Sequence, residues 1–384
     1  MHTESRLTLS QASITALSTA TNSLLALGTS VRTFRTYVKP REYGSLKLKM
    51  WHSNAVDSTW DDGKDSKGSD LGGSWSIEAC YIADGGTDPD GGIDCMVQVP
   101  VTYNGWVTRE VMPGECFWSD EVEINLHEGH YLVISWAIKM KTEADRLPFN
   151  TETLLASAYE AEGNVAHYRD ADEFTYTENK LVLPALITYE KQVKKNIVFI
   201  GDSITQGVRN ELNAEEYWSA KIAAGLGTSY GVWNIGSGWA RAYDLEGDSC
   251  WLNKAMMGDE VIICLGVNDI GTANRSGDQV LAALTYAIQR LKRSNPDVSI
   301  ILFTVPPFNF EQEQEKHWRY VNQVIREAPP AGVDRVFDIA AVLGLPAPMD
   351  RMVNPLYMSN KDDPHPNGLA GTAVAEAFLA WYRA

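Results

Sequence analysis

Near the midpoint of the chain stands Asn196-Ile197-Val198-Phe199-Ile200-Gly201, followed at once by Asp202-Ser203-Ile204-Thr205-Gln206-Gly207. The first part is a short apolar run, which predicts a buried β-strand. The second part is bounded by glycines, which let the backbone turn sharply. A serine placed where a strand ends and a helix begins lies at the carboxyl edge of a sheet, where open α/β sheets bind ligands. Ser203 is therefore a candidate nucleophile, and its own N–H is placed to stabilise an oxyanion.

A general base for this serine is available near the C-terminus, in Asp362-Asp363-Pro364-His365-Pro366-Asn367-Gly368. A serine hydroxyl needs a base at neutral pH, and the pKa of histidine suits that task. The imidazole must be held in one tautomer, usually by a carboxylate. Asp362 stands three residues before His365 and is the predicted partner of its Nδ1 proton. Asp363 is the rival carboxylate for that role.

Two further segments supply candidate donors for an oxyanion. The run Glu260–Leu265 predicts another buried strand and leads into Gly266-Val267-Asn268-Asp269, where Asn268 can offer its side-chain N–H. A short strand around Val232 leads into Asn234-Ile235-Gly236-Ser237-Gly238-Trp239. A glycine there offers a backbone N–H without a blocking side chain.

These four segments give the C-terminal half a resemblance to the SGNH (GDSL-type) hydrolase family, over roughly residues 195 to 384. Gly201-Asp202-Ser203 matches the nucleophile block, Gly266-Val267-Asn268-Asp269 the GxND block, and Asp362-x-x-His365 the DxxH block. The fourth block is matched less cleanly, because the spacing from Asn234 to the second glycine is one residue short. By this resemblance Ser203 is the nucleophile, His365 the general base and Asp362 its orienting carboxylate.

The same resemblance implies an oxyanion hole formed by the N–H groups of Ser203 and Gly238 and the side chain of Asn268, with Gly236 as the alternative glycine. Trp239 adjoins the proposed glycine and is a candidate substrate-binding residue, since a flat aromatic ring stacks on a sugar or bounds an acyl pocket. Asp202 is expected to bond the local backbone and shape the turn. The segment Pro306–Glu315 is expected to form a cleft wall or a lid.

Other interpretations compete with the enzymatic one. A serine after a strand is often only a helix N-cap, and Asp-x-x-His before Pro-Asn-Gly can be a capped turn. A metal-dependent hydrolase would use Asp362 and His365 as ligands. A carbohydrate-binding protein that has lost activity would keep the fold without turnover. The joint presence of four blocks in the right order favours the serine enzyme.

The catalytic half predicts an α/β fold, a three-layer α/β/α sandwich with a parallel sheet. Strands are expected near 196–201, 232–235, 260–265, 298–305 and 335–339, and helices near 214–226, 276–294, 311–327 and 367–383. Val374, Phe378 and Trp381 form a stripe on the last helix that should pack on the sheet.

The first half instead predicts an antiparallel β-sandwich, described as jelly-roll-like. Period-two alternation marks 46–50 and 75–79 as strands, and further strands are expected at 96–101, 105–111, 120–125 and 131–138. Residues 33–140 also resemble, more weakly, the N-terminal β-domain of some two-domain GDSL-type esterases. We expect a helical or irregular lead-in over 1–30, a linker near 180–195, and two domains over 1–190 and 191–384. The role of the first domain stays open between shaping the cleft, holding a sugar chain and mediating assembly.

Composition limits the partners. A formal net charge of −17 disfavours nucleic acid and anionic membrane surfaces, and no apolar run approaches the length of a membrane span. The N-terminal residues lack the unbroken apolar core of a signal peptide, which predicts a cytoplasmic protein as written, or a secreted one if the chain was trimmed. Five scattered cysteines argue against a disulfide scaffold. Two aspartate-rich runs, at 61–70 and 84–94, do not fit EF-hand spacing and predict solvated turns.

The sequence therefore predicts a serine esterase that removes a short acyl group, most simply acetyl, from a carbohydrate through an acyl-enzyme. No cofactor or metal is expected, and a homo-oligomer stays open. Within the enzyme class the alternatives are a short-chain lipase, an arylesterase and a thioesterase.

Overall fold

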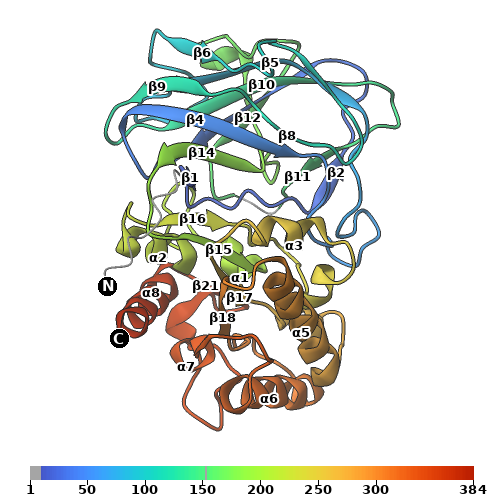
Figure 1. Ribbon diagram of the computed structural model, residues 1–384, viewed down its shortest axis with the longest axis vertical. Helices are drawn as coiled ribbons and strands as arrows, with labels where there is room; N and C mark the ends of the chain where they lie inside the picture. Colours follow the sequence, from blue (N-terminus) through green and yellow to red (C-terminus); the bar gives the residue numbers. More distant parts are fainter. Residues whose placement is uncertain (1–9, 152–153) are drawn as a thin grey trace.

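A computed structural model describes residues 10–151 and 154–384. It places a β-rich N-terminal region against an α/β region that contains the serine (Figure 1). The parallel sheet and the β-rich N-terminal region agree with the sequence prediction, while the jelly-roll-like topology stays a prediction.

Two antiparallel sheets make up most of the N-terminal region. The first has the order β1-β14-β4-β8, with β9 also pairing with β4; its strands are β1 (Ser10–Ser13), β14 (Leu186–Lys191), β4 (Gly44–Ser53), β8 (Cys116–Trp118) and β9 (Val122–Leu126). The second has the order β13-β12-β3-β10-β5-β6, with β7 also pairing with β5; its strands are β13 (Thr175–Tyr176), β12 (Ala158–Glu162), β3 (Arg32–Val38), β10 (Leu132–Met140), β5 (Trp75–Asp84), β6 (Gln98–Pro100) and β7 (Arg109–Val111). A small pair, β2 (Ser23–Leu25) and β11 (Leu147–Phe149), completes the region.

Alternating side chains explain why these strands hold together. In β4 the buried residues Leu46, Leu48 and Met50 alternate with more exposed ones, as period two requires. They join Ile77 and Trp136 of the second sheet in one apolar cluster. The six strands expected in this region all overlap observed strands.

Two expectations for the N-terminal half are wrong. The predicted linker near 180–195 contains β14, because Leu186, Ile187 and Tyr189 are buried against the first sheet. The polar connection is confined to the four residues between β14 and β15. The predicted lead-in over 1–30 contains β1 and β2, while residues 1–9 lie outside the described chain.

The second region is built on a parallel sheet with the order β16-β15-β17-β18-β19. Its strands are β15 (Asn196–Gly201), β16 (Gly231–Asn234), β17 (Glu260–Cys264), β18 (Ser299–Phe303) and β19 (Arg335–Phe337). Four of these strands fall inside the ranges expected for them, and β16 begins one residue before its expected range. The apolar runs that predicted them are buried, as in Val261, Ile262 and Ile263, which are fully inaccessible to solvent.

Helices flank this sheet. The longer ones are α2 (Trp218–Leu226), α5 (Gly277–Ser294), α6 (Gln312–Glu327) and α8 (Gly368–Arg383), and Figure 1 shows α2 and α8 on one side of the sheet and α5 on the other. Shorter elements are α1 (Ser203–Gln206), α3 (Cys250–Ala255), α4 (Val267–Gly271), α7 (Ile339–Leu343), the hairpin β20 (Met358–Asn360)–β21 (Asp363–Pro366), and the 3₁₀ turns η1 (Ala171–Glu173), η2 (Ala242–Leu245) and η3 (Pro355–Tyr357). The α8 stripe packs as predicted, with Phe378 fully buried against Phe303 and Phe337.

The apolar core of the α/β region extends into the N-terminal region. Ala16, Leu17 and Ala20, which follow β1, belong to the same buried cluster as the strands of the parallel sheet. All five cysteines are free, so the predicted absence of a disulfide scaffold holds. Among the described residues, no helix combines the length and apolar character needed to cross a membrane.

Candidate active site

Ser203 is the first residue of α1, with only Asp202 between it and the end of β15, at the strand-to-helix junction that the sequence predicted. Asp202 caps α1, its Oδ1 accepting a hydrogen bond from the Ile204 N–H at 3.0 Å. Gly207 ends the helix with a φ of 106°, and a Cβ there would come within 2.4 Å of the Tyr217 ring. The turn is thus fixed at both ends, and the expected structural role of Asp202 is confirmed.

A chain of hydrogen bonds joins Ser203 to a carboxylate. The Oγ of Ser203 lies 2.9 Å from Nε2 of His365, and Nδ1 of His365 lies 2.6 Å from Oδ1 of Asp363. Asp363 also accepts a hydrogen bond from the His365 backbone N–H and pairs with the Arg209 guanidinium at 2.9 Å. The His365 hydrogen bond is the main reason that the pKa of Asp363 lies well below its ordinary value.

The expectation that Asp362 orients His365 is wrong. The Asp362 side chain is 79% exposed, and its charged neighbour is Lys361, with 3.7 Å between Nζ and Oδ2. Asp363 and His365 lie on the short strand β21, where alternate side chains point to the same face. The strand geometry therefore selects the carboxylate two residues before the histidine.

The candidate oxyanion donors Gly238 and Asn268 follow the carboxyl ends of β16 and β17, the two strands that flank β15. Asn268 lies on α4, directly after β17, and its Nδ2 donates to the Ala240 carbonyl at 3.1 Å. An amide nitrogen carries two hydrogens, so one remains for a ligand. The N–H of Gly236 is already donated to Asn234 Oδ1 at 2.8 Å, which argues against this glycine as an oxyanion donor. Within the described residues, no protein acceptor takes the N–H of Ser203 or of Gly238.

Aromatic rings border the same place. Trp239, the predicted substrate-binding residue, has a φ of 64°, and its ring lies 6.0 Å from that of Trp60, nearly perpendicular to it. Trp60 comes from the N-terminal region, in an aspartate-rich turn that gave no sequence signal for a site residue. Phe308, from the segment expected to form a wall or lid, contacts the His365 ring edge-on at 5.1 Å.

Two buried carboxyl groups adjoin the candidate site residues in the sequence: Asp202 precedes Ser203, and Asp269 follows Asn268. Burial raises the pKa of Asp202 to about 7 and that of Asp269 to about 6, and the proximity of Asp269 contributes to the shift of Asp202. Asp269 Oδ2 accepts the Ala242 N–H at 2.7 Å.

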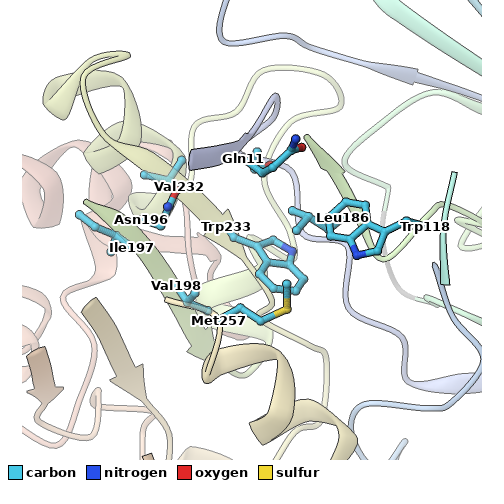
Figure 2. Close-up of a pocket in the computed structure, with 10 residues that line it drawn as sticks. Gln11, Trp118, Leu186, Asn196, Ile197, Val198, Val232, Trp233 and Met257 are labelled. Carbon is cyan, nitrogen blue, oxygen red and sulfur yellow. The ribbon is translucent and has the colours of Figure 1, made fainter. Parts of the chain in front are cut away.

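Other features lie away from Ser203. Among the described residues, one group has the composition of a metal site: Asp84, His127 and His130, in the N-terminal region. Asp84 is 3% exposed and accepts hydrogen bonds from both imidazoles, so the prediction of a solvated turn is wrong for this residue. A cavity of about 220 Å³ lies at the amino ends of β15 and β16, and Trp118, Trp233 and Met257 are among the residues that line it (Figure 2). It is thus at the opposite end of β15 from Ser203.

Comparison with known proteins gives a family for part of the chain. Residues 199–370 match the family model described as GDSL-like lipase/acylhydrolase. Among curated proteins, none matches.

Several solved structures are similar over different spans. The chain is 14% identical to a family two carbohydrate esterase from Clostridium thermocellum in complex with cellohexaose, with a TM-score of 0.40 over 97% of this chain and 98% of that one. It is 13% identical to a family two carbohydrate esterase from Cellvibrio japonicus, with a TM-score of 0.37 over 98% of each chain. It is 18% identical to a carbohydrate esterase family 3 protein from Talaromyces cellulolyticus, with a TM-score of 0.38 over 49% of this chain and 96% of that one.

The family match begins within β15 and ends within α8, so it encloses the serine turn, the Asn268 segment and the histidine strand. Residues 199–370 are a GDSL-like lipase/acylhydrolase domain, and a separate β-rich region precedes it.

Proposed function

We propose that this protein is a serine esterase that hydrolyses short-chain acyl esters, acetyl esters of carbohydrates in particular, through an acyl-enzyme. The observation that carries the proposal is the continuous hydrogen-bonded chain from Ser203 Oγ through His365 to Asp363, with distances of 2.9 and 2.6 Å. A hydroxyl, an imidazole and a carboxylate in this order are the arrangement that activates serine for acyl transfer.

The chemistry follows from the positions of the groups. His365 Nε2 accepts the Ser203 proton as Oγ attacks the ester carbonyl, and Asp363 holds the opposite nitrogen as Nδ1–H. The carbonyl oxygen becomes negatively charged. It accepts hydrogen bonds from the backbone N–H groups of Ser203 and Gly238 and from the free amide hydrogen of Asn268. His365 then protonates the leaving alkoxide. Water, deprotonated by the same imidazole, hydrolyses the acyl-enzyme and frees Ser203.

The surroundings of Ser203 support a small acyl group and a flat ligand. Ser203 and Asn268 are 7% and 8% exposed, which leaves little open space beside the nucleophile. Two tryptophans lie next to Gly238. Trp239 follows it in the sequence, and a Cβ on Gly238 would lie 3.6 Å from the ring of Trp60, which itself contacts Trp239. Indole faces bind the apolar faces of sugar rings.

Hydrolysis of p-nitrophenyl acetate, butyrate and octanoate and of an acetylated xylan tests the proposal, with wild type and Ser203→Ala compared throughout. We expect the wild type to prefer acetate, to release acetate from the polysaccharide, and to lose about a thousandfold or more in kcat on Ser203→Ala. Equal activity of the two proteins, or no turnover by either, would overturn the serine mechanism. A preference for octanoate would contradict the short acyl group.

A further inference from the structure

The backbone that leads to Gly238 is held both by its own α/β region and by the N-terminal region. We call Asn234–Gly238 the oxyanion loop, since it leads to the glycine N–H proposed above. The Asn234 carbonyl accepts the Thr19 N–H at 3.2 Å, and the Gly236 carbonyl accepts Ser18 Oγ at 2.5 Å. Both donors belong to the segment that follows β1. The N-terminal region therefore contributes hydrogen bonds at the start and in the middle of this loop.

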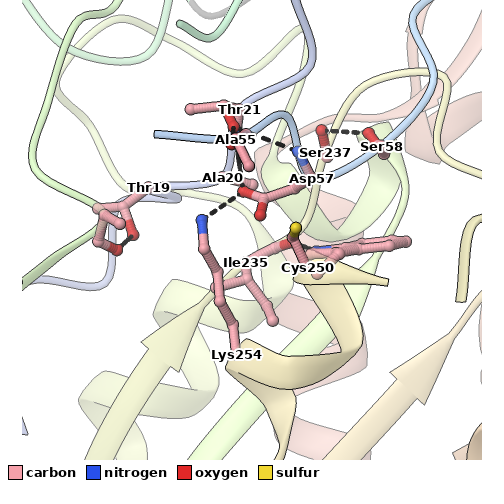
Figure 3. Close-up of polar contacts among 12 residues, drawn as sticks. Thr19, Ala20, Thr21, Ala55, Asp57, Ser58, Ile235, Ser237, Cys250 and Lys254 are labelled. Atoms are coloured by element: carbon pink, nitrogen blue, oxygen red, sulfur yellow. Dashed lines mark hydrogen bonds and ion pairs between the residues drawn. The ribbon is translucent and has the colours of Figure 1, made fainter. Parts of the chain in front are cut away.

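The end of the loop is fixed by a third residue of the N-terminal region. Ser58 Oγ donates to Ser237 Oγ at 2.7 Å, and Ser237, which is fully buried, is the residue directly before Gly238. Figure 3 shows this contact between a chain segment of the first half and the oxyanion loop. The Ser237 N–H in turn donates to the Gly201 carbonyl at 2.9 Å, at the end of β15. Ser237 thus links Ser58 to the strand that presents Ser203.

A buried ion pair anchors the segment that carries Ser58. Asp57 and Lys254 are 0% and 1% exposed, with Oδ2 and Nζ 2.6 Å apart (Figure 3). Asp57 Oδ2 also accepts the Thr21 N–H at 2.8 Å. Lys254 lies on α3, and Trp251 of the same helix donates its Nε1–H to the Ile235 carbonyl at 2.7 Å. The ion pair therefore joins two supports of the oxyanion loop, one from each region.

We infer that the N-terminal β-rich region is a working part of the oxyanion hole, and that Ser58 is a positioning residue for the Gly238 N–H. The inference rests on the proposed esterase function. An oxyanion donor works only when it is held within about 0.5 Å of its productive place. Glycine has no side chain that could fix its position. The hydrogen bond between the Ser58 and Ser237 hydroxyls therefore holds the backbone directly before Gly238.

Ser58→Ala tests this role, and Ser69→Ala is the matched control. Ser69 also joins the two regions by its hydroxyl, accepting the Cys250 N–H at 3.1 Å, but it makes no contact with the oxyanion loop. We expect Ser58→Ala to lower kcat for p-nitrophenyl acetate by about tenfold to a hundredfold, with KM changed less than about twofold, because a misplaced donor costs transition-state binding. Ser58→Thr should retain most of the activity, and Ser69→Ala all of it.

A second measurement separates positioning from a general loss of structure. Sulfur accepts hydrogen bonds more weakly than oxygen, so the ratio of ester to thionoester turnover reports how well the hole holds its acceptor. This ratio should fall in Ser58→Ala and stay at the wild-type value in Ser69→Ala. Ser237→Ala removes the same contact from the other side, and the double variant should be no worse than either single one.

The outcomes are distinguishable from failure of the proposed function. A wild type without esterase activity would refute that function. An active wild type with unchanged kcat and unchanged thionoester ratio in Ser58→Ala would overturn the positioning role. If Ser58→Ala does not fold, Ser237→Ala gives the same two readouts, and wild-type values in it would likewise overturn the inference.

Discussion

His365 owes its orientation to the residue that shares its face of β21. Asp363 approaches Nδ1 from that face, and Arg209 holds the other carboxylate oxygen at 2.9 Å. Asp362 points to solvent, one residue earlier. Two adjacent aspartates of identical chemistry thus differ only in the direction that the strand gives them, which makes them a matched pair for experiment.

We expect Asp363→Asn to lower kcat/KM for p-nitrophenyl acetate by about 10³- to 10⁴-fold, because an amide at this place favours the wrong tautomer of the imidazole. Asp362→Asn should leave kcat/KM within about twofold of wild type. Steady-state kinetics of the two purified variants, with circular dichroism to verify folding, decides between them. Loss of activity in Asp362→Asn alone would restore the original prediction from the sequence.

The chemistry-bearing residues differed in how far the sequence could predict them. Ser203 was placed by the apolar run before it, and the histidine by the need for a base. The choice between Asp362 and Asp363 depends on the short strand β21, which contains two prolines and is too short for a recognisable periodic pattern. Trp60 and Ser58 reach the site from the other half of the chain, and no local pattern encodes such a contact.

At the scale of elements, α1 is a helix of a single turn that begins at a buried carboxyl group. Asp202 caps it through Oδ1, while burial raises the pKa of that carboxyl to about 7. The cap therefore needs only an acceptor oxygen and not a charge. The apolar runs and helix periodicities of this region predicted its longer elements, whereas α1, α3, α4 and α7 are too short for a periodic signal.

The raised pKa of Asp202 gives a pH dependence with a definite sign. Between the unfolded pKa near 4 and the folded value of about 7, the native state binds more protons than the unfolded state. The free energy of unfolding therefore falls as the pH rises through this window. Asp202→Asn keeps the cap and removes the titration, so its Tm relative to wild type should increase from pH 5 to pH 8. Thermal melts at these pH values test this, with the exposed Asp65→Asn as control; a Tm difference that is constant with pH would contradict it.

At the scale of the whole molecule, the two regions meet through polar contacts in addition to the apolar residues that extend from one region into the core of the other. Arg41, just beyond β3, donates to the carbonyls of Ala223, Gly227 and Tyr230, and Thr59 bonds Asp244 at 2.6 Å. The alternating patterns of each half predicted two architectures, but no pattern within either half describes how the halves meet. The ion pair of Asp57 and Lys254 is the most enclosed of these contacts, with both side chains at most 1% exposed.

Removing one charge of that pair should lower the free energy of unfolding far more than removing both charges. We expect Lys254→Met to lower the free energy of unfolding by about 3–5 kcal/mol, because it leaves a buried carboxylate without its partner. Asp57→Asn combined with Lys254→Met should recover a large part of this loss, since the amide oxygen still accepts the Thr21 N–H. Lys316→Met is the matched control: its pair with Glu313 has the same 2.6 Å separation, but the two side chains are 69% and 79% exposed, so the free energy of unfolding should stay close to that of wild type. Guanidinium unfolding followed by tryptophan fluorescence measures all three. A double variant less stable than Lys254→Met would contradict this prediction. It would show that an unpaired buried Asp57 carboxylate is not the main cost of losing Lys254.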